Sequence, residues 1–351
     1  LEEARQQAEA AGYPVACKAV GGGGGKGFRV AMTPDDLQEA FEGSAREGEK
    51  FFSDDRVYVE RYLEDPRHVE VQVLADKHGN VIYLAERDCS IQRRHQKLIE
   101  EAPGPHVDEE MRERIGKIAT DAARAVGYYS AGTIEGMQVG DEYFFLEMNT
   151  RVQVEHCVTE EITGVDIVRE QIKIAYGEEL GLKQEDVEIN GWAIECRINA
   201  EDPFRGFLPS IGRLVKYRPP QTIEGQVRVD TGVFEGGEIS MFYDSMIAKL
   251  ICHGATRDQA VRRMRDALNA FVIRGIDSNI PFQAALMQNS RFLSGLFTTS
   301  FMADEYPSGF VAADVVHDDP GLLAAVAAFG RRRYIDRAVQ VSGQMPGHQR
   351  Q

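Results

Sequence analysis

Residues 18–27 read KAVGGGGGKG, and this glycine-rich stretch lies between two short predicted strands. Because glycine has no side chain, the backbone N–H groups of such a loop can closely approach phosphate oxygens. A Walker A loop is excluded, since Val20 stands where that motif needs glycine and Gly27 where it needs Ser or Thr. A dinucleotide-binding loop is excluded because a strand, not a helix, follows. With Lys18 and Lys26 flanking the glycines, the stretch predicts a lid over a polyphosphate; a flexible linker is the alternative.

The composition restricts the class of protein. The 351 residues carry a formal charge of −16, from 40 Lys and Arg against 56 Asp and Glu. This acidity argues against broad binding to nucleic acid or to an anionic membrane, since both need a basic face. No apolar run approaches the ~20 residues of a membrane span, and no signal peptide opens the chain. The five cysteines are far apart in the sequence, which favours free thiols in a reducing compartment over structural zinc.

Hydrophobic periodicity predicts a mixture of helices and antiparallel hairpins, and therefore an α+β fold. The predicted elements are a helix ending at Gly12, strands 14–20 and 28–31, a helix from Thr33, a hairpin of 69–74 and 81–85, a helix at 108–126, a hairpin of 132–139 and 143–149, a strand-rich part from 190 to 252, and a helix from Thr256 with a capping box completed by Gln259. The length predicts about two or three domains in this chain. Because the chain enters as if within a helix, we also expect it to be a piece of something longer.

Two carboxylates are predicted to face each other across the second hairpin. If residues 140–142 form a three-residue turn, Glu135 pairs directly with Glu147, and the like charges should repel. A divalent cation between them would turn repulsion into binding. With Asn149 on the same face, the oxygen ligands suit Mg²⁺ or Mn²⁺. The alternative is a different register, with one Glu facing solvent.

Polar and apolar residues alternate beyond this carboxylate pair. In an extended chain, Glu147, Asn149, Arg151, Gln153 and Glu155 would all face one way. A solvated edge strand would look similar. A metal-binding carboxylate, an anion-binding arginine and a spare glutamate on one face form a plausible phosphoryl-transfer site, where the protein mainly positions groups and neutralises charge.

Six blocks of sequence carry a family resemblance. They are residues 18–27, 66–72 (PRHVEVQ), 86–97 (ERDCSIQRRHQK), 147–156 (EMNTRVQVEH), 195–203 (ECRINAEDP) and 243–246 (YDSM). Together, and in this order, they resemble biotin carboxylase. The resemblance implies an ATP-grasp fold with a mobile glycine-rich lid, followed by the C-terminal portion of a biotin carboxylase. The implied reaction uses MgATP and bicarbonate to carboxylate biotin through carboxyphosphate.

The resemblance also implies roles for individual residues. Glu155 would be the base that deprotonates bicarbonate, Arg197 would stabilise the biotin enolate, and Lys97 would stabilise the transferring group. Arg151, Gln153 and Val154 would bind bicarbonate, and Glu135, Glu147 and Asn149 would hold Mg²⁺ (or Mn²⁺). The implied nucleotide contacts are Lys18, Gly23, Gly24, Gly25, Glu60, Arg61, Leu63, His68, Gln92 and His95.

Domains and partners follow from the same resemblance. The implied division is 1–62 for the lid subdomain, 63–185 for the catalytic subdomain, 186–305 for the C-terminal portion, and 306–351 for a linker and the start of a further domain. The last segment resembles the junction in acyl-CoA carboxylase α subunits, notably the propionyl-CoA type, and residues 341–345 are interpreted as opening a domain that docks a carboxyltransferase. No Ala-Met-Lys-Met biotin-acceptor motif is present, so biotin would arrive on a separate carrier domain.

The expected partners are therefore bicarbonate, a biotinylated carrier domain and a carboxyltransferase subunit, within a homo- or hetero-oligomer. Neither nucleic acid nor membrane is expected, and the location would be bacterial cytoplasm or mitochondrial matrix. The alternatives are another ATP-grasp ligase, a carbamoyl-phosphate synthase, or an inactive nucleotide-binding fragment. Four positions depart from the family pattern without removing a charged catalytic group: Val20, Arg61, Gly136 and Cys157.

Overall fold

The fold is seen in a computed structural model that describes residues 1–23, 26–316 and 320–339. Gly24 and Gly25 of the glycine run lie outside the described residues, and so does the predicted docking segment 341–345.

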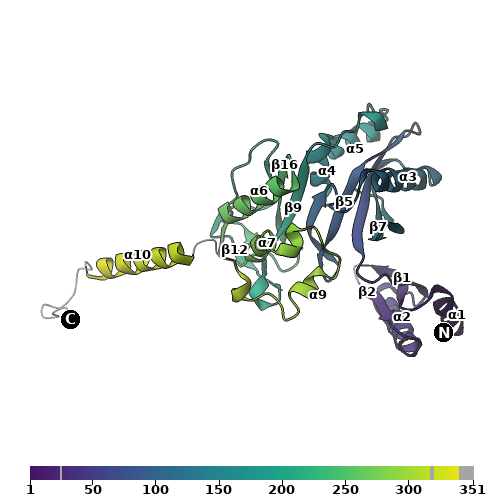
Figure 1. Ribbon diagram of the computed structural model, residues 1–351, viewed down its shortest axis with the longest axis horizontal. Helices are drawn as coiled ribbons and strands as arrows, with labels where there is room; N and C mark the ends of the chain where they lie inside the picture. The colour runs from purple at the N-terminus through teal and green to yellow at the C-terminus, as the bar shows by residue number, and fades with distance from the viewer. Residues whose placement is uncertain (24–25, 317–319, 340–351) are drawn as a thin grey trace. The chain divides into compact units, whose positions relative to one another are not determined.

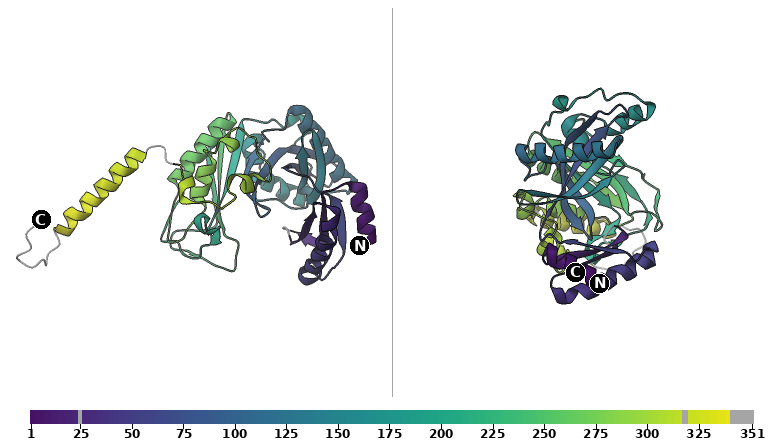
Figure 2. Two further views of the ribbon diagram at one scale, coloured as in Figure 1. Left: turned by 60° about the horizontal axis from the view of Figure 1, so that its bottom comes forward. Right: turned by 90° about the vertical axis from the view of Figure 1, so that its right-hand side faces the viewer.

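The N-terminal part is a three-stranded antiparallel sheet with two helices, and we call it the lid. Its elements are α1 (Glu2–Ala11), β1 (Val15–Gly23), β2 (Lys26–Ala31), a 3₁₀ turn (Pro34–Asp36), α2 (Leu37–Phe52) and β3 (Val57–Arg61). Strand β1 is central, with β2 and β3 on either side. The predicted strand–glycine–strand arrangement is confirmed, but both strands extend further into the predicted loop than expected, and Gly23 pairs with Lys26. The lid, coloured purple, forms a lobe of its own beside the larger sheet (Figure 1, Figure 2).

The large sheet is antiparallel throughout, with strand order β14-β16-β9-β6-β5-β4-β7-β8. Its strands are β4 (Arg67–Ala75), β5 (Val81–Arg93), β6 (Gln96–Ala102), β7 (Ser130–Val139), β8 (Glu142–Asn149), β9 (Trp192–Asn199), β14 (Val227–Thr231) and β16 (Met246–Gly254). Because β6 pairs with β9, one sheet continues across the predicted division at residue 186, which stays a prediction.

Side-chain alternation along β4 shows how the sheet separates core from site. Val69 and Val71 pack with Ile115 of α3 (Glu109–Ala125) in a buried cluster. The intervening Glu70 and Gln72 are also fully buried, and they contact Arg87 of β5 on the other face. That face is covered by α4 (His156–Thr163) and α5 (Ile167–Tyr176) (Figure 1). Buried carboxylates need charged partners, so this face is where chemistry is expected.

The predicted pairing of Glu135 with Glu147 is confirmed, but by a different route. The turn has two residues, since Val139 pairs with Glu142 and not with Tyr143. This register alone would place Glu135 opposite Leu146. A β-bulge between Glu135 and Gly136 shifts the register by one residue and restores the carboxylate pair.

Gly136 is explained by its neighbour across this hairpin. A Cβ atom at Gly136 would lie 2.2 Å from the ring of Tyr143. The Tyr143 hydroxyl donates to the carbonyl of Val69 at 3.2 Å, so the ring is anchored there. Glycine at position 136 therefore makes room for an aromatic ring supplied by the opposite strand.

The predicted extended chain beyond Asn149 is wrong. Strand β8 ends at Asn149, and residues 150–155 are irregular. The backbone N–H of His156 donates to the carbonyl of Gln153 at 3.3 Å, which closes a turn directly before α4. Polar alternation cannot distinguish a strand from a segment that turns to begin a helix.

The predicted helices at 108–126 and from Thr256 are confirmed as α3 and α6 (Arg257–Ala270). The Thr256 side chain caps α6 by accepting from Gln259 N–H, but the Gln259 side chain accepts from Ala255 N–H, so the predicted capping box is displaced by one residue. The predicted helix from Thr33 is confirmed after one intervening 3₁₀ turn.

The remaining elements complete the C-terminal half. They are β10 (Glu201–Asp202), β11 (Leu208–Pro209), β12 (Gly212–Arg213), β13 (Lys216–Arg218), β15 (Glu238–Ile239), β17 (Val272–Arg274), α7 (Ile280–Leu286), α8 (Ser290–Leu293), α9 (Phe301–Glu305), and the 3₁₀ turns Gln184–Asp186, Pro203–Arg205 and Ala312–Asp314.

A second unit begins at Val311 and contains α10 (Pro320–Val339). This helix is longer than the short helical stretches expected here, and it buries none of its residues, as the lack of a core pattern predicted. Its alanines have a high intrinsic helix propensity. Among the described residues, no helix combines the length and apolarity needed to cross a lipid bilayer.

Candidate active site

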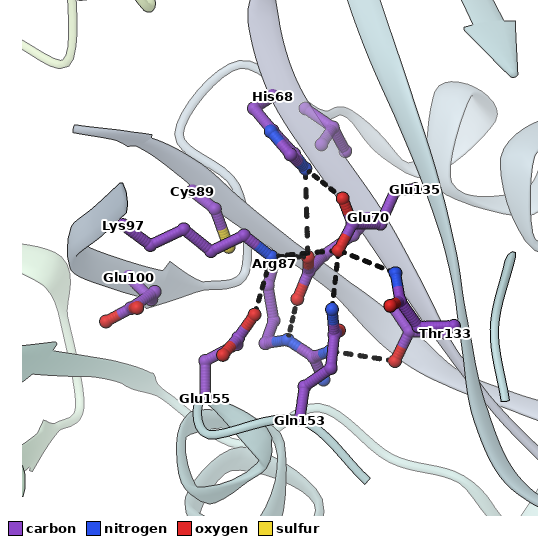
Figure 3. A network of polar contacts seen from close by, with 12 residues as sticks. His68, Glu70, Arg87, Cys89, Lys97, Glu100, Thr133, Glu135, Gln153 and Glu155 are labelled. Carbon is purple, nitrogen blue, oxygen red and sulfur yellow. Dashed lines mark hydrogen bonds and ion pairs between the residues drawn. The ribbon is translucent and has the colours of Figure 1, made fainter. Parts of the chain in front are cut away.

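Lys97 gathers three carboxylates on the α4 face of the large sheet. Its Nζ atom lies 2.5 Å from Glu70 Oε2, 2.6 Å from Glu155 Oε1 and 3.1 Å from Glu135 Oε1. Figure 3 shows the lysine approaching these side chains from one side. Although burial opposes the charge on Lys97, the surrounding carboxylates, Glu70 first, hold its pKa well above the usual value. The site therefore contains a permanent cation with several acidic partners.

A buried arginine, Arg87, also contacts this carboxylate cluster. Arg87 is fully buried, and its Nε donates to Glu70 Oε1 at 2.6 Å. Its other nitrogens donate to the side chains of Gln72, Thr133, Gln153 and Thr159. Burial alone would raise the pKa of Glu70, but Lys97 and Arg87 outweigh it and lower that pKa to about 2. Glu70 is thus an anion with both oxygens committed to cations.

The predicted metal ligands meet at the β7–β8 hairpin. Asn149 Nδ2 lies 3.0 Å from Glu135 Oε1 and 3.3 Å from Glu147 Oε1, so the three side chains converge. Glu135 also accepts from Gln153 at 2.5 Å and lies 3.0 Å from His68 Nε2. The carboxylate oxygens of Glu135 and Glu147 are hard donors, which fits Mg²⁺ or Mn²⁺, whereas the Asn149 amide turns its nitrogen toward them and its Oδ1 toward Arg151.

The predicted base lies between two cations. Glu155 is nearly fully buried, and its second oxygen accepts from Arg197 Nη2 at 2.8 Å. Arg197 Nε donates to Glu100 Oε1 at 2.6 Å, which orients the guanidinium. Despite burial, Glu100 and Glu155 hold the Arg197 pKa above its usual range. Lys97 and Arg197 together hold the Glu155 carboxylate in one orientation, as a general base requires.

The predicted nucleotide contacts fall into two groups. In the lid, Lys18 forms an ion pair with Glu60, and Arg61 is exposed. Leu63, just beyond the lid, is partly buried. On the large sheet, Gln92 Nε2 lies 2.9 Å from His68 Nδ1. His95 contacts the lid, because its ring lies 5.8 Å from that of Phe28. Gly23 ends β1.

The predicted bicarbonate residues are also divided. Gln153 lies at the buried network, where it contacts both Arg87 and Glu135. Val154 precedes the base in the chain. Arg151 is exposed and donates to Asn149 Oδ1 at 3.1 Å, so the structure places it beside the metal-ligand group.

Sequence reasoning missed several residues of this site. Glu70, Arg87 and Glu100 carry its buried charge balance, although each lies in or next to a recognised block. The sequence pattern could have identified Glu70. It alternates with Val69 and Val71 along the strand and therefore lies on the same face as His68. Phe28 was missed as well; Lys18 Nζ lies 5.7 Å from the centre of its ring. The five cysteines are free, as expected, and all five are buried.

A three-stranded lid with a glycine-rich sequence between two of its strands, beside an antiparallel sheet that carries paired carboxylates, is the ATP-grasp architecture. A model of the ATP-binding domain of the carbamoyl-phosphate synthase L chain matches residues 1–183, and a model of the biotin carboxylase C-terminal domain matches residues 195–304. The chain belongs to the biotin carboxylase family.

Individual relatives agree with this assignment. The chain is 54% identical to biotin carboxylase 1 of Bacillus subtilis, over 86% of this chain and 67% of that one. It is 50% identical to the propionyl-CoA carboxylase alpha chain of Ruegeria pomeroyi, over 99% of this chain and 54% of the relative. This chain therefore spans about half the length of the propionyl-CoA carboxylase relatives it matches.

A solved structure has the same fold. The biotin carboxylase domain dimer of Hydrogenobacter thermophilus 2-oxoglutarate carboxylase, in complex with MgADP, ADP and bicarbonate, has a TM-score of 0.84 and 46% identity. The match covers 91% of this chain and 69% of that one.

Proposed function

We propose that this chain catalyses the ATP-dependent carboxylation of biotin on a carrier domain, the first half-reaction of an acyl-CoA carboxylase. The observation that carries this proposal is the position of Glu155 between Lys97 Nζ and Arg197 Nη2, at 2.6 and 2.8 Å. A weak acid such as bicarbonate needs a base to become a nucleophile, and a buried carboxylate held by two cations can take its proton. The similarity to a structure that contains MgADP and bicarbonate supports the same assignment.

The roles of the chain's residues follow from charge and position. Glu155 takes the proton of bicarbonate, which Arg151, Gln153 and Val154 bind. Lys97 neutralises charge that develops on the transferring phosphoryl and carboxyl groups, and Arg197 stabilises the enolate of biotin. The fork of Arg197 suits this task, because one nitrogen is held by Glu100 and another faces Glu155.

ATP would lie between the lid and the large sheet. Lys18, with Gly23, Gly24 and Gly25, would contact the phosphates, while Glu60, Arg61, Leu63, His68, Gln92 and His95 would line the nucleotide site. Glu135, Glu147 and Asn149 would hold Mg²⁺ or Mn²⁺, which neutralises phosphate charge when bound.

The same proposal includes the domain division at residues 62, 185 and 305. It also includes two partners. A biotinylated carrier domain supplies biotin, and a carboxyltransferase subunit consumes the carboxylated product. Relatives from bacteria and from mitochondria favour the bacterial cytoplasm or the mitochondrial matrix.

The test is bicarbonate-dependent ATP cleavage by the natural protein that carries this chain, with and without free biotin. We expect biotin to stimulate phosphate release. Absence of stimulation would overturn the proposal. Stimulation by ammonia in place of biotin would favour a carbamoyl-phosphate synthase, the reading that Arg197 and the C-terminal family match oppose. No ATP cleavage with intact nucleotide binding would favour a non-catalytic fragment.

A further inference from the structure

Lys249 of β16 lies directly opposite Arg197 of β9 in the large sheet. Two cations at such a cross-strand pair repel each other unless nearby acids compensate. Acids are available on several sides: Arg197 contacts Glu100 and Glu155, and Lys249 Nζ lies 3.6 Å from Asp230. Because placing Arg197 and Lys249 side by side is unfavourable, we expect the two cations to have separate tasks.

The contact made by Lys249 differs from that of Arg197. Its Nζ atom donates to the backbone carbonyl of Val154 at 2.7 Å, whereas Arg197 contacts the Glu155 side chain. Val154 and Glu155 are the two central residues of the turn closed by His156 N–H and the Gln153 carbonyl. The first central carbonyl of such a turn points away from the turn's own hydrogen bond, so it needs an outside donor. Lys249 is that donor.

This contact determines how the base is presented. The carbonyl of Val154 and the N–H of Glu155 belong to one planar peptide unit, so holding the carbonyl orients the backbone that carries Glu155. The same turn carries Gln153, whose side chain reaches Glu135 and Arg87. A shift of this one peptide unit would therefore displace the base together with a proposed bicarbonate contact.

Lys249 is suited to a fixed position. Its side chain is 12% exposed. A second contact, 2.9 Å from Nζ to Cys157 Sγ, restricts it further. Burial opposes its charge, but the neighbouring acidic groups, Glu195 first, hold its pKa above the usual value. The ammonium group thus remains charged in a tightly packed place between the sheet and the start of α4.

We infer that Lys249 is a positioning residue for biotin carboxylation: it holds the Gln153–His156 turn in the orientation that places Glu155 against bicarbonate. The inference rests on the proposed function for its kinetic consequence, but the structural part stands without it. Cys157 is a secondary contact, and the carbonyl of Val154 is the essential one.

The experiment compares Lys249→Met with Lys249→Arg in the natural protein that carries this chain. For Lys249→Met we expect the KM for bicarbonate to rise about tenfold or more, the size of effect that follows loss of a charged hydrogen bond, with the KM for ATP changed less than about twofold. Lys249→Arg should recover part of this loss, because a guanidinium also donates to a carbonyl. Cys157→Ala should leave the KM for bicarbonate within about twofold.

Lys77→Met is the matched control. Lys77 also donates to a backbone carbonyl, that of Ala175 at 3.4 Å, but it is exposed and away from the site. Its loss should change neither KM. An equal rise in the KM for ATP and for bicarbonate in Lys249→Met would indicate general damage and overturn the inference, as would an unchanged KM for bicarbonate.

Amide hydrogen exchange gives a readout that does not depend on activity. Lys249→Met should accelerate exchange at residues 153–157 and leave β4 and β7 unchanged. Unchanged exchange in the turn overturns the inference whatever the enzyme does. If the wild-type protein shows no biotin-stimulated ATP cleavage, the proposed function fails, while the exchange result still decides the positioning role.

Discussion

Arg197 Nη2 donates to Glu155 Oε2 at 2.8 Å, although the two residues are 42 positions apart. The arginine lies on β9, and the glutamate lies in the turn before α4. The base is thus held between a strand from the C-terminal half and Lys97 from β6. This geometry makes the charge of Glu155, and not only its shape, essential to the proposed reaction.

Glu155→Gln should abolish carboxylation while leaving ATP binding intact. The amide keeps the size of the side chain but cannot accept a proton, so we expect bicarbonate-dependent ATP cleavage to fall at least about 100-fold. Steady-state phosphate release and equilibrium binding of a fluorescent nucleotide measure the two effects. Glu185→Gln, at an exposed position, is the control. Unchanged turnover in Glu155→Gln would remove this residue as the base.

Glu147→Gln should weaken metal binding. Glu147 lies opposite Glu135 and within 3.3 Å of the Asn149 amide, so it supplies one of two facing carboxylates. We expect the Mg²⁺ concentration for half-maximal activity to rise about tenfold or more, with activity partly recovered at high Mg²⁺. Glu142→Gln, exposed at the start of the same strand, should behave as wild type. Equal Mg²⁺ requirements in both variants would contradict this assignment.

Arg87→Met should destabilise the fold. The substitution would leave Glu70 buried with only Lys97 as a direct cation, and it would remove four other side-chain hydrogen bonds. Breaking a buried ion pair from one side costs about 3 kcal/mol or more. Urea unfolding measures the change in free energy. Arg46→Met removes only an exposed pair with Glu42, and should have no measurable effect. Similar free energies of unfolding for the two variants would show that the charge of Arg87 does not stabilise the fold.

Asp88→Asn should change the pH dependence of stability. Burial raises the pKa of Asp88 to about 6, and its Oδ2 atom has no hydrogen-bond partner. A folded pKa above the unfolded value of about 4 means that the folded state binds the proton more tightly. Stability from this group is therefore present below pH 4 and is lost as the pH rises to about 6.

The expected size of this loss is about 2 kcal/mol in wild type. Asp88→Asn should remove it, so the difference in unfolding free energy between pH 4 and pH 7 should shrink by that amount. Asp258→Asn, at an exposed position, should retain the wild-type profile. Parallel profiles for Asp88→Asn and wild type would contradict the raised pKa.

Local patterns predicted much of the fold. The strand–glycine–strand arrangement, the two hairpins, and helices α3 and α6 follow from periodicity and capping, which depend on residues close together in the chain. Even the facing carboxylates of the second hairpin were predictable. The bulge that produces this register was not predictable, because the local alternation of residues does not mark where a strand takes up an extra residue.

The sequence by itself determined the hairpins, the glycine-rich lid and the residue types of the site. Only the tertiary structure decided that Lys97, Arg197 and Lys249 meet at one turn, because they lie on β6, β9 and β16, whose adjacency arises from long-range pairing. It also decided that residues 150–155 turn and do not extend. Pairing between strands that are distant in the chain produces no periodic pattern in the sequence, so the sequence alone does not predict which strands are neighbours.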